Sequence, residues 1–165
     1  MSKLIKLAYE IAEKAHRGQL DKAGRPYIEH PLAVAASVDG EDAKVTALLH
    51  DVMEDTPITA DELAAAGLPP HIVEALVLLT HRSSDSYDDY IQRLRSNRLA
   101  VRVKLADLRH NSDLSRLPNI TPKDLARTEK YRRYIELLSH DSDSSVRILS
   151  FLSGNKSGYT IINHH

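Results

Sequence analysis

The chain has 165 residues, of which 42% are hydrophobic and 27% charged, with a formal net charge of −1. These values are typical of one ordinary globular domain, and the near-neutral charge argues against a general nucleic-acid or membrane-surface binder. There is no cysteine, so any metal must be held by nitrogen and oxygen ligands. The chain has no apolar run long enough to span a bilayer, and its N-terminus does not resemble a secretion signal, so we expect a cytoplasmic protein.

Nearly every periodic segment has the helical period of apolar residues, and no segment alternates as a strand. A first helix is expected over residues 4–15, with Ser2 as its N-cap and Gly18 closing it. A loop follows at residues 20–26, which are rich in turn-forming types. The remaining helices are expected at about residues 32–38, 41–55, 59–66, 70–79, 87–94, 99–117, 121–138 and 142–152. The predicted fold is all-α, a single compact bundle of short helices over residues 1–153 with a flexible tail at 154–165.

The segment from Leu48 to Asp55 carries the first functional signal. On a continuous helix, Asp51 would stack on Asp55, a like-charge pair that normally destabilises a helix. Glu54 and Asp55 would also fall in the last turn, where the helix dipole favours cations. Acids placed against both preferences, next to the imidazole of His50, indicate a bound cation. The alternative is a solvated helix end with a lone histidine.

Two other segments can complete a metal site. His30 stands just before a predicted helix start, and Asp107 lies in the apolar context of residues 103–106, where an unpaired carboxylate is costly to bury. Together with His50 and Asp51 they offer two imidazoles and two carboxylates, which suit a divalent ion such as Mn, Fe or Zn, with carboxylates and water favouring Mn. Taken alone, His30 could be a helix-start residue, and Asp107 could pair with Arg109 or a lysine.

Further polar residues could act beside such a site. Glu54 and Asp55 would lie near the metal and could orient or deprotonate an attacking water. In the loop, Lys22 and Arg25 form a plausible phosphate clamp, although both could be solvated charges. Asn111 lies four residues after Asp107, on the same helix face.

The whole set of motifs resembles the HD-domain metal-dependent phosphohydrolases and, more narrowly, the hydrolase domain of RelA/SpoT-type enzymes. A spaced histidine, a His-Asp pair and a distant aspartate form the broader signature. The narrower match comprises residues 15–19 (AHRGQ), Lys22, Gly24, residues 26–28 (PYI), 30–31 (HP), 47–51 (ALLHD), 54–56 (EDT) and 104–107 (KLAD) with Asn111. The synthetase half of the long bifunctional enzymes is absent, so the chain looks like a stand-alone alarmone hydrolase.

This resemblance implies an all-helical HD hydrolase domain that binds Mn²⁺ and releases pyrophosphate from the ribose 3′ position of guanosine tetra- or pentaphosphate. The positions matching the family's metal ligands are His30, His50, Asp51 and Asp107. Glu54 and Asp55 match the pair assigned to water activation, and Lys22 and Asn111 match substrate-contacting positions.

The chain departs from the family pattern at Asp21, where the family usually has an arginine that packs against the guanine base. Arg25 is a candidate to replace that arginine in part. Leu114 stands where the family often has a threonine near the phosphates. These differences leave three alternatives open: an HD hydrolase of another nucleotide or phosphate ester, a non-catalytic metal- or nucleotide-binding module, and a structural helical protein without metal.

Overall fold

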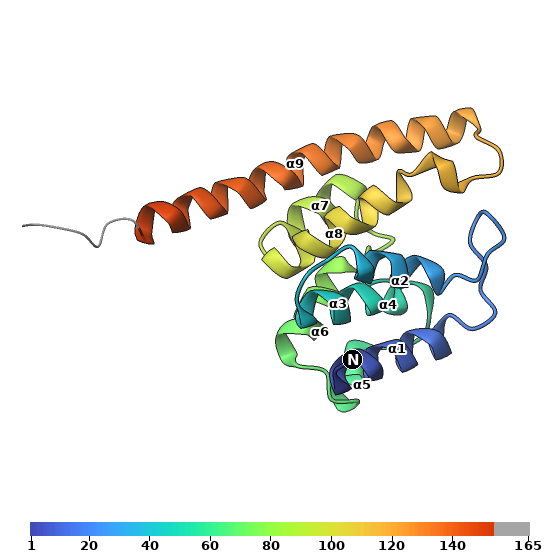
Figure 1. Ribbon diagram of the computed structural model, residues 1–165, viewed down its shortest axis with the longest axis horizontal. Helices are drawn as coiled ribbons and strands as arrows, with labels where there is room; N and C mark the ends of the chain where they lie inside the picture. Colours follow the sequence, from blue (N-terminus) through green and yellow to red (C-terminus); the bar gives the residue numbers. More distant parts are fainter. Residues whose placement is uncertain (154–165) are drawn as a thin grey trace, which may run out of the picture.

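The computed structural model describes the backbone of residues 1–153 and the side chains of residues 1–140 (Figure 1). Its helices are α1 (Lys3–Ala15), α2 (Glu29–Ala36), α3 (Glu41–Leu49), α4 (Val52–Asp55), α5 (Ala60–Ala65), α6 (Pro70–Leu79), α7 (Tyr87–Leu94), α8 (Arg98–Asn111), the 3₁₀ helix η1 (Leu114–Arg116) and α9 (Pro122–Ser153). Within residues 1–153 the only strand-like pairing is an isolated bridge between Leu20 and Pro26, so the all-α prediction is confirmed. The predicted tail at 154–165 lies outside the described residues.

Local sequence explains where several helices begin. The Ser2 hydroxyl accepts a hydrogen bond from the Ile5 amide at 3.1 Å, which caps α1. Thr59 and Glu62 form the predicted capping box at the start of α5, because each side chain bonds to the other's backbone amide. Pro70 occupies the first turn of α6, where its missing N–H removes no helical hydrogen bond.

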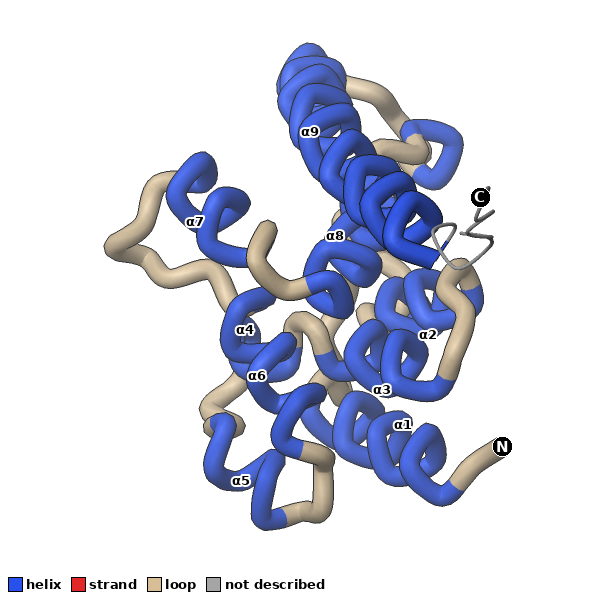
Figure 2. The backbone as a smooth tube through the Cα atoms, turned by 90° about the vertical axis from the view of Figure 1, so that its left-hand side faces the viewer, coloured by secondary structure: helices blue, strands red, loops and turns tan. Residues whose placement is uncertain are grey.

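Helix α3 is the centre of the bundle. It packs against α1, α2, α6 and α8, and six of its nine residues are buried. Figure 2 shows α1, α2 and α3 lying side by side, with α9 alongside α8 at the other end of the molecule. Because α2, α3 and α8 contact one another in the core, the polar side chains of His30, His50 and Asp107 are buried close together. None of the helices described here is both long and apolar enough to cross a membrane.

Three predicted helix boundaries beyond residue 40 are wrong. The helix expected over residues 41–55 is divided at His50 and Asp51, which are the C-cap of α3 and the N-cap of α4. The ring nitrogen Nδ1 of His50 bonds to the Ala47 carbonyl at 2.7 Å, and this is the carbonyl that a continuous helix would offer to the Asp51 amide.

The other two wrong boundaries concern the C-terminal half of the chain. The helix expected over residues 99–117 ends at Asn111 and is followed by η1. The two helices expected at 121–138 and 142–152 form one helix, α9, because residues 139–141 contain neither glycine nor proline to break it. Helix α2 also begins at Glu29, so that His30 is its second residue and does not precede it.

Candidate metal centre and adjoining cavity

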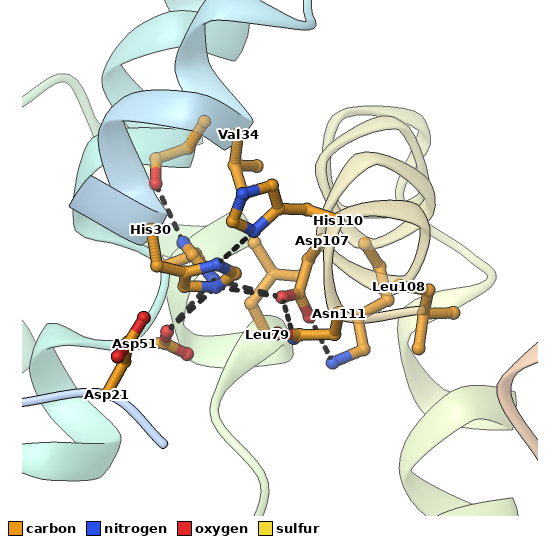
Figure 3. Close-up of polar contacts among 12 residues, drawn as sticks. Asp21, His30, Val34, Asp51, Leu79, Asp107, Leu108, His110 and Asn111 are labelled. Atoms are coloured by element: carbon orange, nitrogen blue, oxygen red, sulfur yellow. Dashed lines mark hydrogen bonds and ion pairs between the residues drawn. The ribbon is translucent and has the colours of Figure 1, made fainter. Parts of the chain in front are cut away.

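Four predicted ligands meet at the junction of α2, α3, α4 and α8 (Figure 3). His30, His50 and Asp107 are buried, and each offers a ligand atom within 4.8 Å of the other two. Asp51 approaches from a more open side, with its side chain 20% exposed. The four residues lie as many as 77 positions apart in the sequence, so the fold, and not local structure, creates the cluster.

The distances within the cluster suit a single ion. His30 Nε2 lies 3.3 Å from His50 Nε2 and 3.1 Å from Asp107 Oδ1. Asp51 Oδ2 lies 3.0 Å from His50 Nε2 and 3.6 Å from His30 Nε2. Ligand atoms held at about 2.1 Å from one metal ion would be separated by roughly 3.0–3.4 Å. The chemistry and the spacing of this donor set therefore fit a divalent metal.

The outer nitrogens of the two imidazoles are already bonded, which directs both Nε2 atoms to the cluster. His50 Nδ1 lies 2.7 Å from the Ala47 carbonyl and must carry the proton there. His30 Nδ1 lies 2.7 Å from Nδ1 of His110. Burial, with His30 and Arg116 nearby, lowers the pKa of His110 to about 4, so that its neutral ring can accept this bond. Such outer partners fix the orientation of metal-binding histidines.

Asp107 is held from both sides. Its Oδ2 atom lies 2.8 Å from the ammonium of Lys104, and its Oδ1 atom accepts a hydrogen bond of 2.7 Å from the Asn111 amide. Burial alone would raise the pKa of Asp107, but Lys104 and the two histidines hold it well below its usual range. Asp107 is thus an ionised, buried carboxylate, and a metal ligand must be in that state.

Carboxylates dominate the electrostatics on the Asp51 side. Burial opposes the charged form of His50, but Asp51 and Asp107 raise the pKa of His50 well above its usual range. His50 in turn lowers the pKa of Asp51 to about 2, although burial acts against this shift. The Tyr27 hydroxyl donates a hydrogen bond of 2.5 Å to Asp51 Oδ2. The cluster therefore attracts positive charge, as a metal site must.

Glu54 and Asp55 lie on α4, one turn beyond Asp51, and both are exposed. Glu54 Oε2 accepts a hydrogen bond of 3.1 Å from the backbone amide of His81, which ties α4 to the segment after α6. Partial burial raises the pKa of Glu54, and partial burial together with Asp51 raises the pKa of Asp55. Carboxylates with raised pKa values next to a metal site can accept a proton from water.

A cavity of about 270 Å³ opens from the cluster toward the 20–26 loop. It is lined by Leu20, Asp21, Lys22, Ala23, Tyr27, His30, Asn111, Asp113, Arg116, Leu117, Arg127 and Tyr131. Two predicted substrate contacts, Lys22 and Asn111, are thus brought to one cavity. Arg25 is not among the lining residues, because its side chain is 60% exposed and lies 4.0 Å from Glu29.

Several residues of this region were not predicted from the sequence. His110 lies three residues after Asp107 on α8, and this spacing could have placed it beside the ligands. Tyr27 belongs to a predicted motif but had no assigned role. Arg116 lies on η1 and Arg127 on α9, and neither carries a sequence signal that points to the cavity.

Known proteins resemble this chain in sequence and in fold. The family model of the HD domain matches residues 8–97. A GTP pyrophosphokinase of Myxococcus xanthus is 34% identical over 66% of this chain, and the bifunctional (p)ppGpp synthase/hydrolase SpoT of Escherichia coli strain K12 is 32% identical over 66%. A guanosine-3′,5′-bis(diphosphate) 3′-pyrophosphohydrolase of Haemophilus influenzae is 34% identical over 61%. The matches cover 16–18% of these relatives, so the chain spans less than a fifth of their length.

The fold is shared with a solved structure described as a metazoan ortholog of SpoT that hydrolyzes ppGpp and plays a role in starvation responses. The superposition has a TM-score of 0.68 and covers 86% of each chain, at 23% sequence identity. At that identity the likeness establishes the shared fold.

Proposed function

Because the chain belongs to the HD-domain family, we propose that it is a cytoplasmic, metal-dependent phosphohydrolase that acts on guanosine 3′,5′-bis(diphosphate). The observation that carries this proposal is the convergence of His30, His50 and Asp107 on one point, beside a cavity that contains Lys22 and Asn111. The relatives named for hydrolysis of this nucleotide support the choice of substrate.

We propose Mn²⁺ as the metal, held by His30, His50, Asp51 and Asp107. Two imidazoles and two carboxylates form a mixed donor set, and carboxylate ligands favour Mn²⁺ over softer ions. When bound, the ion would polarise the scissile phosphate and lower the pKa of a bound water. The protein holds its ligands ready for this, because each histidine is fixed through its outer nitrogen and Asp107 is kept ionised.

The remaining residues have separate roles in the proposed reaction. Glu54 and Asp55 orient the water and accept its proton, for which their raised pKa values suit them. Lys22 and Asn111 contact the phosphates from the cavity wall. Water adds to the phosphorus attached to the ribose 3′ oxygen, and the bond to that oxygen breaks. The oxygen takes up a proton, and the products are GDP and pyrophosphate.

Product analysis tests this proposal. The purified protein is incubated with Mn²⁺ and guanosine 3′,5′-bis(diphosphate), and pyrophosphate and GDP are quantified. Equal amounts of the two products are expected, and chelation should stop their release. The matched variant is Glu54→Gln with Asp55→Asn, which should retain the metal and lose turnover. A wild-type protein that binds Mn²⁺ but gives no product would contradict hydrolysis of this nucleotide, and only the absence of product from every nucleotide tested would favour a metal-binding module.

One specific observation favours a second candidate, a related phosphohydrolase of another nucleotide. Asp21 stands where RelA/SpoT-type enzymes usually have an arginine, and its carboxylate binds Arg116. A panel of nucleotides with Mn²⁺ supplied separates the two candidates. Release of orthophosphate from other nucleotides, without pyrophosphate from the guanosine bis(diphosphate), would exclude the preferred substrate and retain the HD chemistry.

A further inference from the structure

Arg116 on η1 is held in a fixed position at the cavity wall. Its Nη1 atom lies 3.1 Å from His110 Nδ1 and 3.2 Å from the His110 carbonyl, and its Nη2 atom lies 3.4 Å from Asp21 Oδ2. Its side chain is 25% exposed and lines the cavity. These contacts involve both terminal nitrogens and fix the plane of the guanidinium, so that its face can serve as a stacking surface for a ligand.

Asp21 is built to hold this arginine. Its Oδ1 atom accepts hydrogen bonds from the amides of Ala23 at 2.8 Å and of Arg25 at 2.9 Å, which closes the loop on itself. Gly24 adopts a φ of 76°, a conformation that favours glycine, and so allows this tight turn. The Oδ2 atom is left for Arg116, 95 residues later in the chain.

The surroundings of Arg116 favour an uncharged, flat ligand group over a phosphate. Asp21 pairs with the arginine, and Asp113 adds a second carboxylate to a cavity wall that also carries Lys22 and Arg127, so an anion beside Arg116 would meet a carboxylate as well as the cation. Leu20 and Leu117 line the same cavity, and Leu20 is 65% exposed. An aromatic base would cover these apolar groups and stack on the guanidinium face.

We propose that Arg116, anchored by Asp21, is the platform on which the base of a purine nucleotide stacks. The inference rests on the proposed function for the location of the nucleotide, and it adds a specificity-determining residue. The phosphates would then lie toward Lys22 and Asn111, which line the cavity together with the metal ligand His30.

Calorimetric titration of the full chain in Mn²⁺ buffer tests the platform with two probes. GDP carries a base, whereas inorganic pyrophosphate carries only phosphates. Arg116→Lys keeps the charge and removes the plane, so it should weaken GDP binding roughly 3- to 30-fold and change pyrophosphate binding less than about twofold. Arg17→Lys is the matched control, because Arg17 is also paired with a carboxylate, Glu13 at 2.7 Å, but lies just after the end of α1 with its side chain 70% exposed.

A second variant covers the possibility that Arg116→Lys does not fold, which a thermal melt would show. Asp21→Asn keeps an oxygen for the loop amides and removes the charge that holds Arg116, so it should weaken GDP binding in the same selective way. Equal losses of affinity for GDP and for pyrophosphate would identify Arg116 as a phosphate ligand and overturn the platform. Unchanged affinity for both probes, or no GDP binding by the wild type, would also overturn it. Failure of the proposed function can be told apart from failure of the platform. If GDP binding depends on Arg116 but guanosine 3′,5′-bis(diphosphate) releases no pyrophosphate, the platform is retained and the proposed substrate is rejected.

Discussion

Replacing Lys104 by methionine should have opposite effects on the stability of the metal-free protein and on its affinity for metal. Lys104 Nζ lies 2.8 Å from Asp107 Oδ2, and the two side chains are 12% and 6% exposed. The ammonium also lies 5.1 Å from the ring centre of Tyr90. Removing one partner of such a buried pair costs about 3–5 kcal/mol, because the other charge is left without compensation. For 165 residues this corresponds to a melting temperature roughly 6–20 °C lower in EDTA.

Metal binding should become tighter in the same variant. Lys104 neutralises part of the charge of Asp107 and adds positive charge beside the ligand cluster. Without it, the carboxylate interacts with the metal alone, and the affinity for Mn²⁺ should rise roughly tenfold, a change of about 1.4 kcal/mol. Scanning calorimetry in EDTA measures the first effect, and competition with a fluorescent chelator measures the second.

Lys130→Met is the control, since the Lys130 ammonium lies 4.3 Å from the ring centre of Tyr87 and belongs to the same aromatic cluster. It should alter neither metal affinity nor stability by a comparable amount. If Lys104→Met binds Mn²⁺ more weakly than the wild type, Lys104 supports the geometry of the site and does not compete with the metal. An unchanged melting temperature in EDTA would refute the idea that Lys104 compensates a buried charge.

Three further outcomes follow from the site. Glu54→Gln should lower kcat roughly 10²- to 10⁴-fold while Mn²⁺ titration shows unchanged affinity. Replacing a metal ligand would instead lower both kcat and the affinity for Mn²⁺. The raised pKa of Glu54 means that its proton is held more tightly in the folded than in the unfolded protein, so stability falls as pH rises from 4.5 through the folded pKa. Urea unfolding of metal-free protein at pH 7 should therefore show Glu54→Gln slightly stabilised, by less than about 1 kcal/mol because this carboxyl is exposed. Mn²⁺ at a hundredfold excess over its Kd should raise the melting temperature by about 5–11 °C, EDTA should reverse the rise, and an unchanged melt would argue against a site preformed in the folded protein.

Local chemistry made most helices predictable. Ser2, the Thr59–Glu62 pair and Pro70 act within one turn of the chain, and a sequence pattern displays such short-range interactions directly. The ligand set could also be anticipated, because two histidines and two aspartates in apolar or helix-end contexts have few structural uses. The ligand and water-handling roles themselves stay predictions until metal and product are measured.

Tertiary contacts decided what the sequence could not. Asp21 contacts Arg116 at the cavity wall and His30 contacts His110 behind it, and these pairs are separated by 95 and 80 residues. Arg25 seemed the nearest replacement for a base-packing arginine because it is close to Asp21 in sequence. The fold instead turns Arg25 toward solvent and supplies Arg116 from η1. Sequence distance from Asp21 therefore does not decide which arginine lines the cavity.

The division of the helix at His50 also changes the argument that first suggested a cation. On a continuous helix, Glu54 and Asp55 would oppose the dipole in a last turn. In the structure His50 ends α3, and Glu54 and Asp55 lie on α4, a helix of four residues whose first and last turns coincide, so no dipole preference opposes the acids there. The acids are thus not misplaced, and the case for a metal must rest on the convergence of His30 and Asp107 on the same point. The side chain of His50 is 3% exposed and that of Asp51 20%, whereas Glu54 and Asp55 are exposed, and this arrangement suits the proposed roles of ligands and water-handling residues.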